Sequence, residues 1–129
     1  MPRHPSGQPT QVELEILQVL WELGPSPLGD IHQAVSKRRD VAYSTTRKMV
    51  QVMREKGLID CDDKVRPQRY LAALSQEETR EGLVDDLAER AFGGSTRNLV
   101  MSLLSSKKLS DDELSELKDL IEKSKGGEK

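Results

Sequence analysis

The side chains best suited to chemistry in this sequence are basic and amide groups gathered in its middle. Residues 37–69 contain ten lysines and arginines against five acidic residues, a local charge of +5. Guanidinium, ammonium, amide and hydroxyl groups can donate hydrogen bonds to phosphate oxygens and to the edges of nucleic-acid bases. The segment therefore favours binding to a polyanion, although basic residues on small helical proteins often form only a solvated face.

Catalytic and metal sites are poorly supported by the composition. The one cysteine, Cys61, cannot form an internal disulfide, and with two histidines the chain lacks the ligands of a zinc cage. The sequence offers no serine–histidine–aspartate set, no nucleophilic cysteine with a partner histidine and no glycine-rich phosphate loop. We therefore expect no enzymatic activity, no metal and no cofactor, and we interpret Cys61 as a partly buried apolar side chain.

Length and hydropathy limit the size and location of the protein. The 129 residues carry a net charge of −2, and 35% are hydrophobic but only 3% aromatic, so leucine, valine and isoleucine must build the core. That length suits one domain with a helical extension. No apolar run approaches the roughly 20 residues that span a bilayer, and the proline-rich start lacks a secretory signal, so we expect a cytoplasmic protein without membrane insertion.

Capping and stop signals predict three helices in the N-terminal half. Residues 10–13 form a capping box, and the helix that they start is expected to end at Gly24. Ser26 is expected to cap a second helix. A third helix should follow residues 41–44 and stop at Gly57 in the left-handed conformation.

The third helix and the segment after it are typical of a DNA-binding domain. One arc of the helix is apolar and the opposite side is polar and basic, and two short strands are expected over residues 58–61 and 68–71. A winged helix-turn-helix has this order, with the third helix in the major groove and the hairpin along the DNA backbone. We interpret residues 10–74 as such a domain, mainly α with a small β-hairpin wing, and residues 1–9 as a disordered N-terminus.

The candidate DNA-binding side chains follow from this interpretation. The polar face of the third helix can reach base edges, the wing can reach phosphates, and the tyrosine before the helix can either stack on the backbone or pack inside the protein. The candidates are Tyr43, Ser44, Arg47, Lys48 and Gln51, at the start of the helix and on its polar face, and Lys64, Arg66 and Arg69 in the wing.

The C-terminal part is predicted to be a three-helix region that pairs with a second copy of the chain. Capping boxes begin at Ser75 and Ser110, and two glycines separate the first two helices. Such helices cannot close a core alone, so we interpret residues 75–124 as a dimerisation domain and residues 125–129 as a flexible tail. The candidate interface residues are Leu83, Leu87, Phe92, Leu99, Leu103, Leu114, Leu117, Leu120 and Ile121.

Several motifs together resemble a known family. They are Thr10-Gln-Val-Glu-Leu-Glu-Ile-Leu-Gln-Val-Leu-Trp21, Ala42-Tyr-Ser-Thr-Thr46, Lys56-Gly-Leu-Ile59, Arg69-Tyr70, Phe92-Gly-Gly-Ser95 and Leu109-Ser-Asp-Asp-Glu-Leu114. In order and spacing they are similar to the penicillinase-repressor (BlaI/MecI/CopY) family. The resemblance implies a homodimeric transcriptional repressor on an inverted-repeat operator. By position it adds Thr45 to the DNA-binding candidates, beside Ser44, Arg47 and Lys48, with Arg66 and Arg69 in the wing.

Departures from the family pattern bear on the operator and on the inducing signal. Thr46 stands where the family usually has an aliphatic residue, and Lys48 where it usually has threonine, so a different operator sequence is expected. The tail lacks the paired cysteines of copper-responsive members, and the residues near Ser102 and Leu103 do not match a family cleavage site closely. Release through a protease or sensor pathway stays open, as do two other functions: a protein-interaction module and a regulator that responds to a small molecule.

Overall fold

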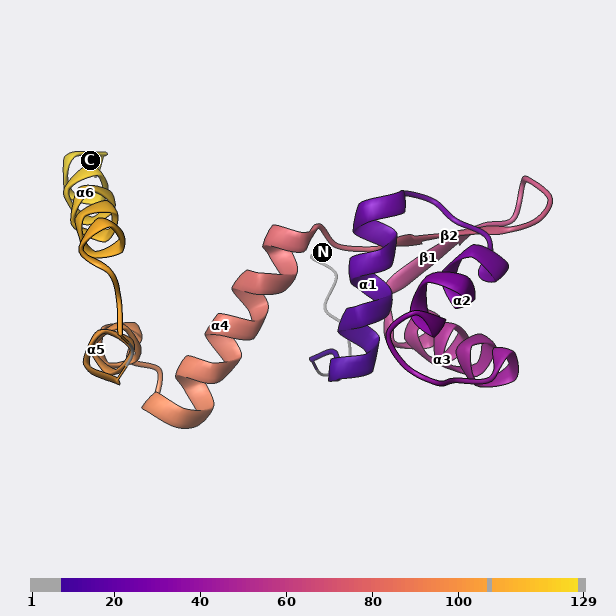
Figure 1. Ribbon diagram of the computed structural model, residues 1–129, viewed down its shortest axis with the longest axis horizontal. Coiled ribbons are helices and arrows are strands. Elements are labelled where there is room, and N and C mark those ends of the chain that lie inside the picture. Colours follow the sequence, from indigo (N-terminus) through magenta and orange to yellow (C-terminus); the bar gives the residue numbers. More distant parts are fainter. Residues whose placement is uncertain (1–7, 107, 128–129) are drawn as a thin grey trace. The chain divides into compact units, whose positions relative to one another are not determined.

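The computed structural model describes residues 8–106 and 108–127 and confirms a mainly helical chain with one small sheet (Figure 1). The chain forms two compact units, one that extends to Asp86 and one that begins at Leu87. Residues 1–7 of the expected disordered N-terminus and residues 128–129 of the expected tail lie outside the described residues.

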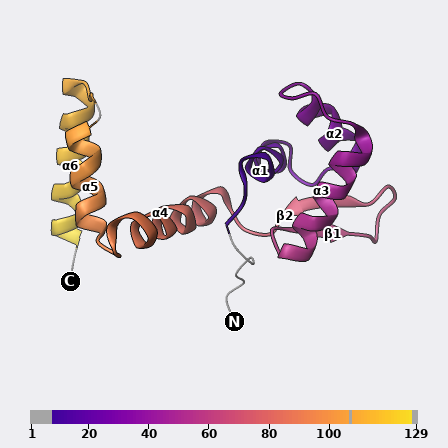
Figure 2. The ribbon, with the colours of Figure 1, turned by 90° about the horizontal axis from the view of Figure 1, so that it is seen from below.

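Three helices and a hairpin form most of the first unit (Figure 2). The elements are α1 (Gln11–Leu23), α2 (Leu28–Ser36), α3 (Tyr43–Lys56), β1 (Ile59–Asp62) and β2 (Arg69–Ala72). The capping box at the start of α1 is present, because Thr10 Oγ1 accepts from the Glu13 N–H at 3.2 Å and the Glu13 carboxylate accepts from the Thr10 N–H at 2.9 Å. Gly57 ends α3 with φ +85°, a conformation that favours glycine.

Ser26 does not have the capping role expected from the sequence. Pro27 occupies the cap position of α2, and the Ser26 hydroxyl instead donates to the Gly24 carbonyl oxygen at 2.7 Å. The Ser26 N–H donates to the Tyr70 carbonyl oxygen at 2.9 Å, and the Tyr70 N–H donates to the Ser26 carbonyl oxygen at 2.7 Å. Ser26 therefore forms an isolated antiparallel β-bridge with β2. A cap is a local signal, whereas this pairing depends on a strand that lies more than 40 residues later.

The two strands begin and end one residue later than expected and pair antiparallel. Ile59 lies opposite Ala72, and Cys61 lies opposite Tyr70. Because alternate side chains of a strand share a face, these four residues lie on one side of the hairpin. That side contributes the buried Ile59 and the half-buried Tyr70 and Ala72 to the core.

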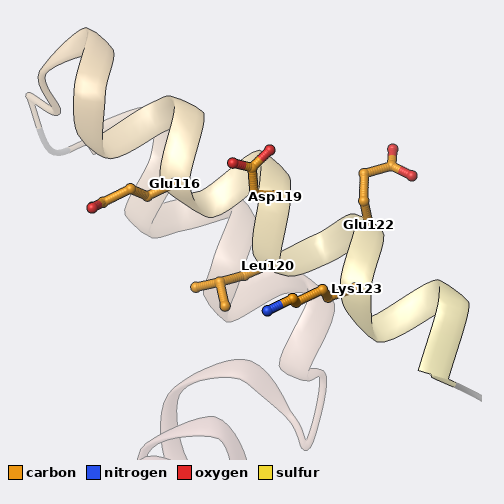
Figure 3. A pocket seen from close by; sticks show the side chains of 5 residues that line it. All are labelled: Glu116, Asp119, Leu120, Glu122 and Lys123. Carbon is orange, nitrogen blue, oxygen red and sulfur yellow. The ribbon is translucent and has the colours of Figure 1, made fainter.

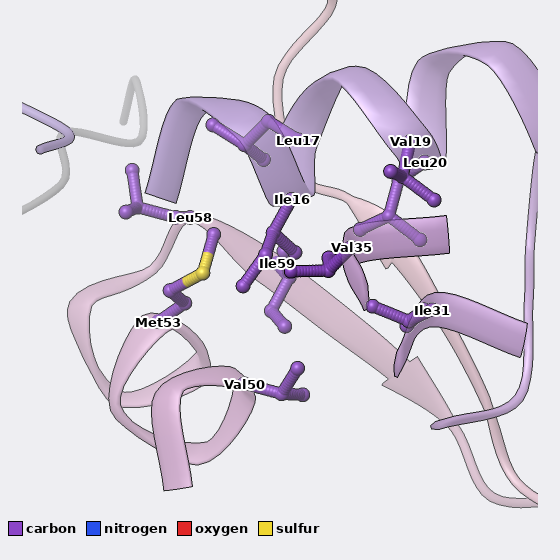
Figure 4. Packing of buried hydrophobic residues seen from close by; sticks show 10 residues of the cluster. All are labelled: Ile16, Leu17, Val19, Leu20, Ile31, Val35, Val50, Met53, Leu58 and Ile59. Carbon is purple, nitrogen blue, oxygen red and sulfur yellow. The ribbon is translucent and has the colours of Figure 1, made fainter. Parts of the chain in front are cut away.

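A closed apolar core holds the three helices and the hairpin together. Its buried side chains come from all of them, as Figure 4 shows: Ile16, Leu17, Val19 and Leu20 of α1, Ile31 and Val35 of α2, Val50 and Met53 of α3, and Leu58 and Ile59 at the hairpin. Leu23, in the last turn of α1, is 57% exposed and does not belong to this core. Burial of ten aliphatic side chains is the main force that positions α3.

Two polar contacts add to the core by tying α3 to its neighbours. Lys56, the last residue of α3, donates to both carboxylate oxygens of the buried Glu13 at 2.9 Å. At the other end, the His32 Nδ1 of α2 lies 2.9 Å from the hydroxyl of Thr46, a residue that is 1% exposed. The His32 ring also meets the Tyr43 ring edge-on, with the ring centroids 5.3 Å apart. Both ends of α3 are therefore anchored by polar groups.

The exit from the hairpin is also anchored. The Trp21 indole N–H donates to the Leu74 carbonyl oxygen at 3.0 Å, which joins α1 to the end of the hairpin.

A new helix, α4 (Gln76–Phe92), then begins with a capping box in which Ser75 and Glu78 each accept from the other's backbone N–H. The expected cap at Ser75 is therefore confirmed.

The second unit contains the end of α4 and two further helices, α5 (Thr96–Ser106) and α6 (Asp111–Gly127). Gly93 and Gly94 both have positive φ and end α4, as expected. The Ser110 capping box is present, with the Glu113 N–H 3.0 Å from Ser110 Oγ. The α6 helix continues to Gly127, so residues 125–127 of the expected tail are helical. None of the helices in the described part of the chain is long and apolar enough to cross a membrane.

The contact between His32 and Thr46 can be tested by a double-mutant cycle. His32→Ala removes the partner of a buried hydroxyl and should lower the free energy of unfolding by about 1–2 kcal/mol. Thr46→Val removes the hydroxyl, so the double variant should lose less stability than the two single variants add up to. Urea denaturation followed by circular dichroism measures this, and strictly additive losses would contradict the coupling.

Candidate nucleic-acid interface

The outer face of α3 is a continuous polar and basic surface. Every helical candidate is exposed: Tyr43, Ser44, Thr45, Arg47, Lys48 and Gln51. Ser44, Arg47, Lys48 and Gln51 follow the spacing i, i+3, i+4 and i+7 and therefore share one side of the helix. Thr46, Val50 and Met53 lie buried on the opposite side, in agreement with the two faces expected from the sequence.

The first turn of α3 presents Tyr43 at its edge. Half of the Tyr43 side chain is exposed, and the His32 ring covers part of the rest. Of the two roles open to this tyrosine, packing against α2 is therefore present, and the exposed half leaves room for a contact with a ligand. The sequence did not indicate the role of His32, because its partners Tyr43 and Thr46 lie 11 and 14 positions later in the chain.

The candidates in the wing are exposed, but they differ in what holds them. Arg66 donates to the backbone carbonyl oxygens of Asp63 and Val65, the latter at 3.0 Å, so its guanidinium folds over the turn. The Lys64 backbone N–H donates to Asp62 Oδ1 at 3.1 Å, and Lys64 is exposed. Arg69 begins β2 opposite Asp62. Of these three side chains, Arg66 is therefore the one with hydrogen bonds to the turn itself.

A polar hollow lies between α3 and β2. Its volume is about 220 Å³, and its lining residues are Arg47, Gln51, Arg54 and Tyr70. Arg47 and Gln51 were predicted, whereas Arg54 and Tyr70 were not. The spacing of residues 47, 51 and 54 along one side of a helix could have indicated Arg54. Tyr70 could be found only from the pairing of the strands.

The Tyr70 hydroxyl has an altered acidity in this hollow. Burial raises the pKa of Tyr70 above its ordinary value by desolvating the phenolate, and the neighbouring Cys61 acts in the same direction. Arg54 and Arg47 oppose this shift, because their positive charge favours the phenolate. Tyr70 therefore stays protonated at neutral pH and can donate a hydrogen bond, within the field of two guanidinium groups.

The predicted dimerisation residues divide by exposure. Leu87, Leu103, Leu114, Leu117, Leu120 and Ile121 are exposed, Leu83 and Phe92 are half-buried, and Leu99 is only 6% exposed within its own chain. An apolar hollow of about 400 Å³ is lined by Val100 and Leu104 of α5 together with four apolar residues of α6. The second unit thus leaves much of its apolar surface uncovered, in contrast to the first.

Another hollow, lined mainly by charged side chains, lies along α6. Figure 3 shows that its labelled side chains all come from this one helix: Glu116, Asp119, Leu120, Glu122 and Lys123. The acidic residues do not converge, and among residues 8–106 and 108–127 no group of three histidine, cysteine or acidic side chains could hold a metal ion. This hollow is a helix surface with an open side.

Comparison with known proteins places the chain among transcriptional regulators. A family model described as penicillinase repressor matches residues 9–123. The methicillin resistance regulatory protein MecI of Mammaliicoccus sciuri is 20% identical over 114 residues, or 88% of this chain and 93% of that protein. The transcriptional regulator BlaI of Mycobacterium tuberculosis is 33% identical over 86 residues, or 65% of this chain and 62% of that protein.

A solved structure also aligns with the chain. A MarR family protein from Bacillus stearothermophilus aligns with 92% of this chain and 74% of its own, with 24% identity and a TM-score of 0.47. The family model extends from the start of the first helix into the last, and so covers most of the chain. The resemblance seen in the sequence motifs is therefore confirmed, and the chain belongs to the penicillinase repressor family.

Proposed function

We propose that this protein is a sequence-specific DNA-binding repressor that acts as a homodimer on an inverted-repeat operator. The observation that carries the proposal is the outer face of α3, where exposed polar and basic side chains lie opposite a fully buried stripe. In a winged helix-turn-helix this face enters the major groove. The hairpin beside it carries Lys64, Arg66 and Arg69, which suit contacts to the phosphate backbone.

The homodimer is supported by the apolar surface of the second unit. Exposed leucines line a hollow between α5 and α6, and apolar groups in water favour association with a complementary surface. A second copy of the chain supplies such a surface by symmetry. Two copies then present two α3 helices, which would read half-sites about 34–36 Å apart, or a multiple of this.

Release of the DNA would follow from loss of the dimer. One winged helix makes half of the contacts, so a signal that cuts or remodels the second unit is sufficient to weaken operator binding. The relatives MecI and BlaI are named as regulators of methicillin resistance and of transcription, respectively. For this chain, we propose release by a signal that acts on the second unit, either a protease or a small molecule.

The first test is whether the protein protects a symmetric site. A footprint on the DNA upstream of its own gene should reveal an inverted repeat, and a gel-shift titration should give affinity at least about a thousandfold higher than for scrambled DNA. Binding that ignores sequence and disappears with salt would contradict specific repression. In that case the interaction-module function would take its place.

The helix and the wing should contribute in different ways, and two lysine substitutions form a matched pair. Lys48→Ala should alter which bases are preferred in the half-site, since a good contact to a base edge discriminates by about 1–3 kcal/mol. Lys64→Ala should weaken binding to all sequences alike and reduce the salt dependence. Binding selection on randomised half-sites measures both, and the reverse pattern would show that the roles are exchanged.

Dimerisation can be tested at the most exposed leucine of the second unit. Leu120 is 59% exposed, so Leu120→Asp should leave the fold intact but place a charge in the interface. Sedimentation should shift toward the monomer, and operator binding should weaken sharply. Ser115→Asp, which adds the same charge at another exposed position of α6, is the control. A dimer unaffected by Leu120→Asp would place the interface elsewhere.

A further inference from the structure

We infer that the hollow lined by Arg47, Gln51, Arg54 and Tyr70 is a binding site for a phosphate group, filled in the DNA complex by a phosphate of the backbone. This inference rests on the proposed DNA binding and adds two contacts, Arg54 and Tyr70, that were not among the DNA-binding candidates predicted from the sequence. It also gives Arg47 a role at a phosphate.

The geometry brings donors from two elements to one place. Arg47, Gln51 and Arg54 lie on successive turns of α3, and Tyr70 reaches the same hollow from β2, where the pairing with Ser26 and Cys61 fixes its backbone. A half-buried tyrosine that packs against the core has little freedom to move. The hollow is therefore preformed on one wall, while the arginines of the other wall can adjust to a ligand.

The chemistry of the lining selects an oxyanion. All four lining side chains offer N–H or O–H donors, and no acidic side chain is among the described residues that line the hollow. Guanidinium groups match the oxygens of a phosphate with two hydrogen bonds at once, and two of them stabilise its charge. Gln51 and Tyr70 can donate to the remaining oxygens.

The electrostatics of Tyr70 support the same conclusion. Arg54 and Arg47 lie close enough to its hydroxyl to favour a negative oxygen there. A phosphate oxygen beside the hydroxyl would be favoured by the same field. Because burial keeps the phenol protonated, Tyr70 would meet that oxygen as a donor rather than as a second negative charge.

The position of the hollow points to the DNA backbone as the source of the phosphate. It lies between α3, which we propose enters the major groove, and the hairpin, which in this fold runs along the backbone. A free phosphate ion has the same chemistry and could occupy the site in the absence of DNA. The experiment therefore includes one arm for each source.

The DNA arm compares Arg54→Gln, Tyr70→Phe and the control Arg97→Gln on the footprinted duplex and on a scrambled duplex. Arg97 is an exposed arginine of α5, so its variant makes the same change of charge away from the hollow. Arg54→Gln should reduce the slope of log K against log salt by about 2, since a dimer has two hollows and each phosphate contact contributes about 0.9. Tyr70→Phe keeps the ring and should weaken binding on the order of tenfold.

The free-ion arm titrates inorganic phosphate into the DNA-free protein at constant ionic strength, with NMR detection of the Arg54 and Tyr70 side chains. Equal losses on both duplexes in the first arm identify the backbone as the source. Saturable shifts with unchanged salt slopes identify a free phosphate. Normal slopes together with no saturable shift overturn the inference, as would a changed base preference in Arg54→Gln. If the wild-type protein still protects its operator in that case, the proposed function stands without this site.

Discussion

The structure depends on a single constraint, which is that α3 must bury one narrow stripe while its opposite side stays in water. Val50 and Met53 belong to the core cluster with side chains of α1, α2 and the start of the hairpin, and Thr46 is buried beside His32 of α2. The polar anchors at the two ends of the helix, to His32 and to Glu13, fix its rotation and its position along the axis. Because the buried side is held so completely, the outer side is presented as a rigid surface, which suits recognition of a regular partner such as duplex DNA.

Features that depend on neighbouring residues were predictable from the sequence, and features that depend on distant pairing were not. The capping boxes at Thr10, Ser75 and Ser110 and the stop at Gly57 are local, since each satisfies backbone groups within one helical turn. Ser26 looked like a cap by the same rules, but the backbone of Tyr70 offered it two hydrogen bonds. The polar hollow could not be predicted from the sequence for the same reason, because Tyr70 lines it from a strand whose neighbours are set by tertiary structure. Of the candidate site, the helix face could therefore be found from periodicity, and the wall opposite it could not.

The two units satisfy the hydrophobic effect in different ways. The first encloses its aliphatic side chains with helices on one side and a hairpin on the other, and it closes a core within one chain. The second has helices with good caps, but it leaves Leu103, Leu114 and Ile121 about half exposed. Helices of this length gain most of their stability from packing of an apolar face. The stability of the second unit therefore depends on protein concentration if a second copy covers that face, whereas the first unit has no such dependence.

The division of α3 into a buried and an exposed side also bears on how such a protein can diverge. A substitution at Val50 or Met53 disturbs packing and is costly, while exposed positions such as Ser44 and Lys48 tolerate most side chains with little change in stability. Selection can then act on the exposed positions one at a time without first restoring the fold. In a lineage of duplicated genes, the descendants of one chain could acquire separate target sequences while keeping the same scaffold.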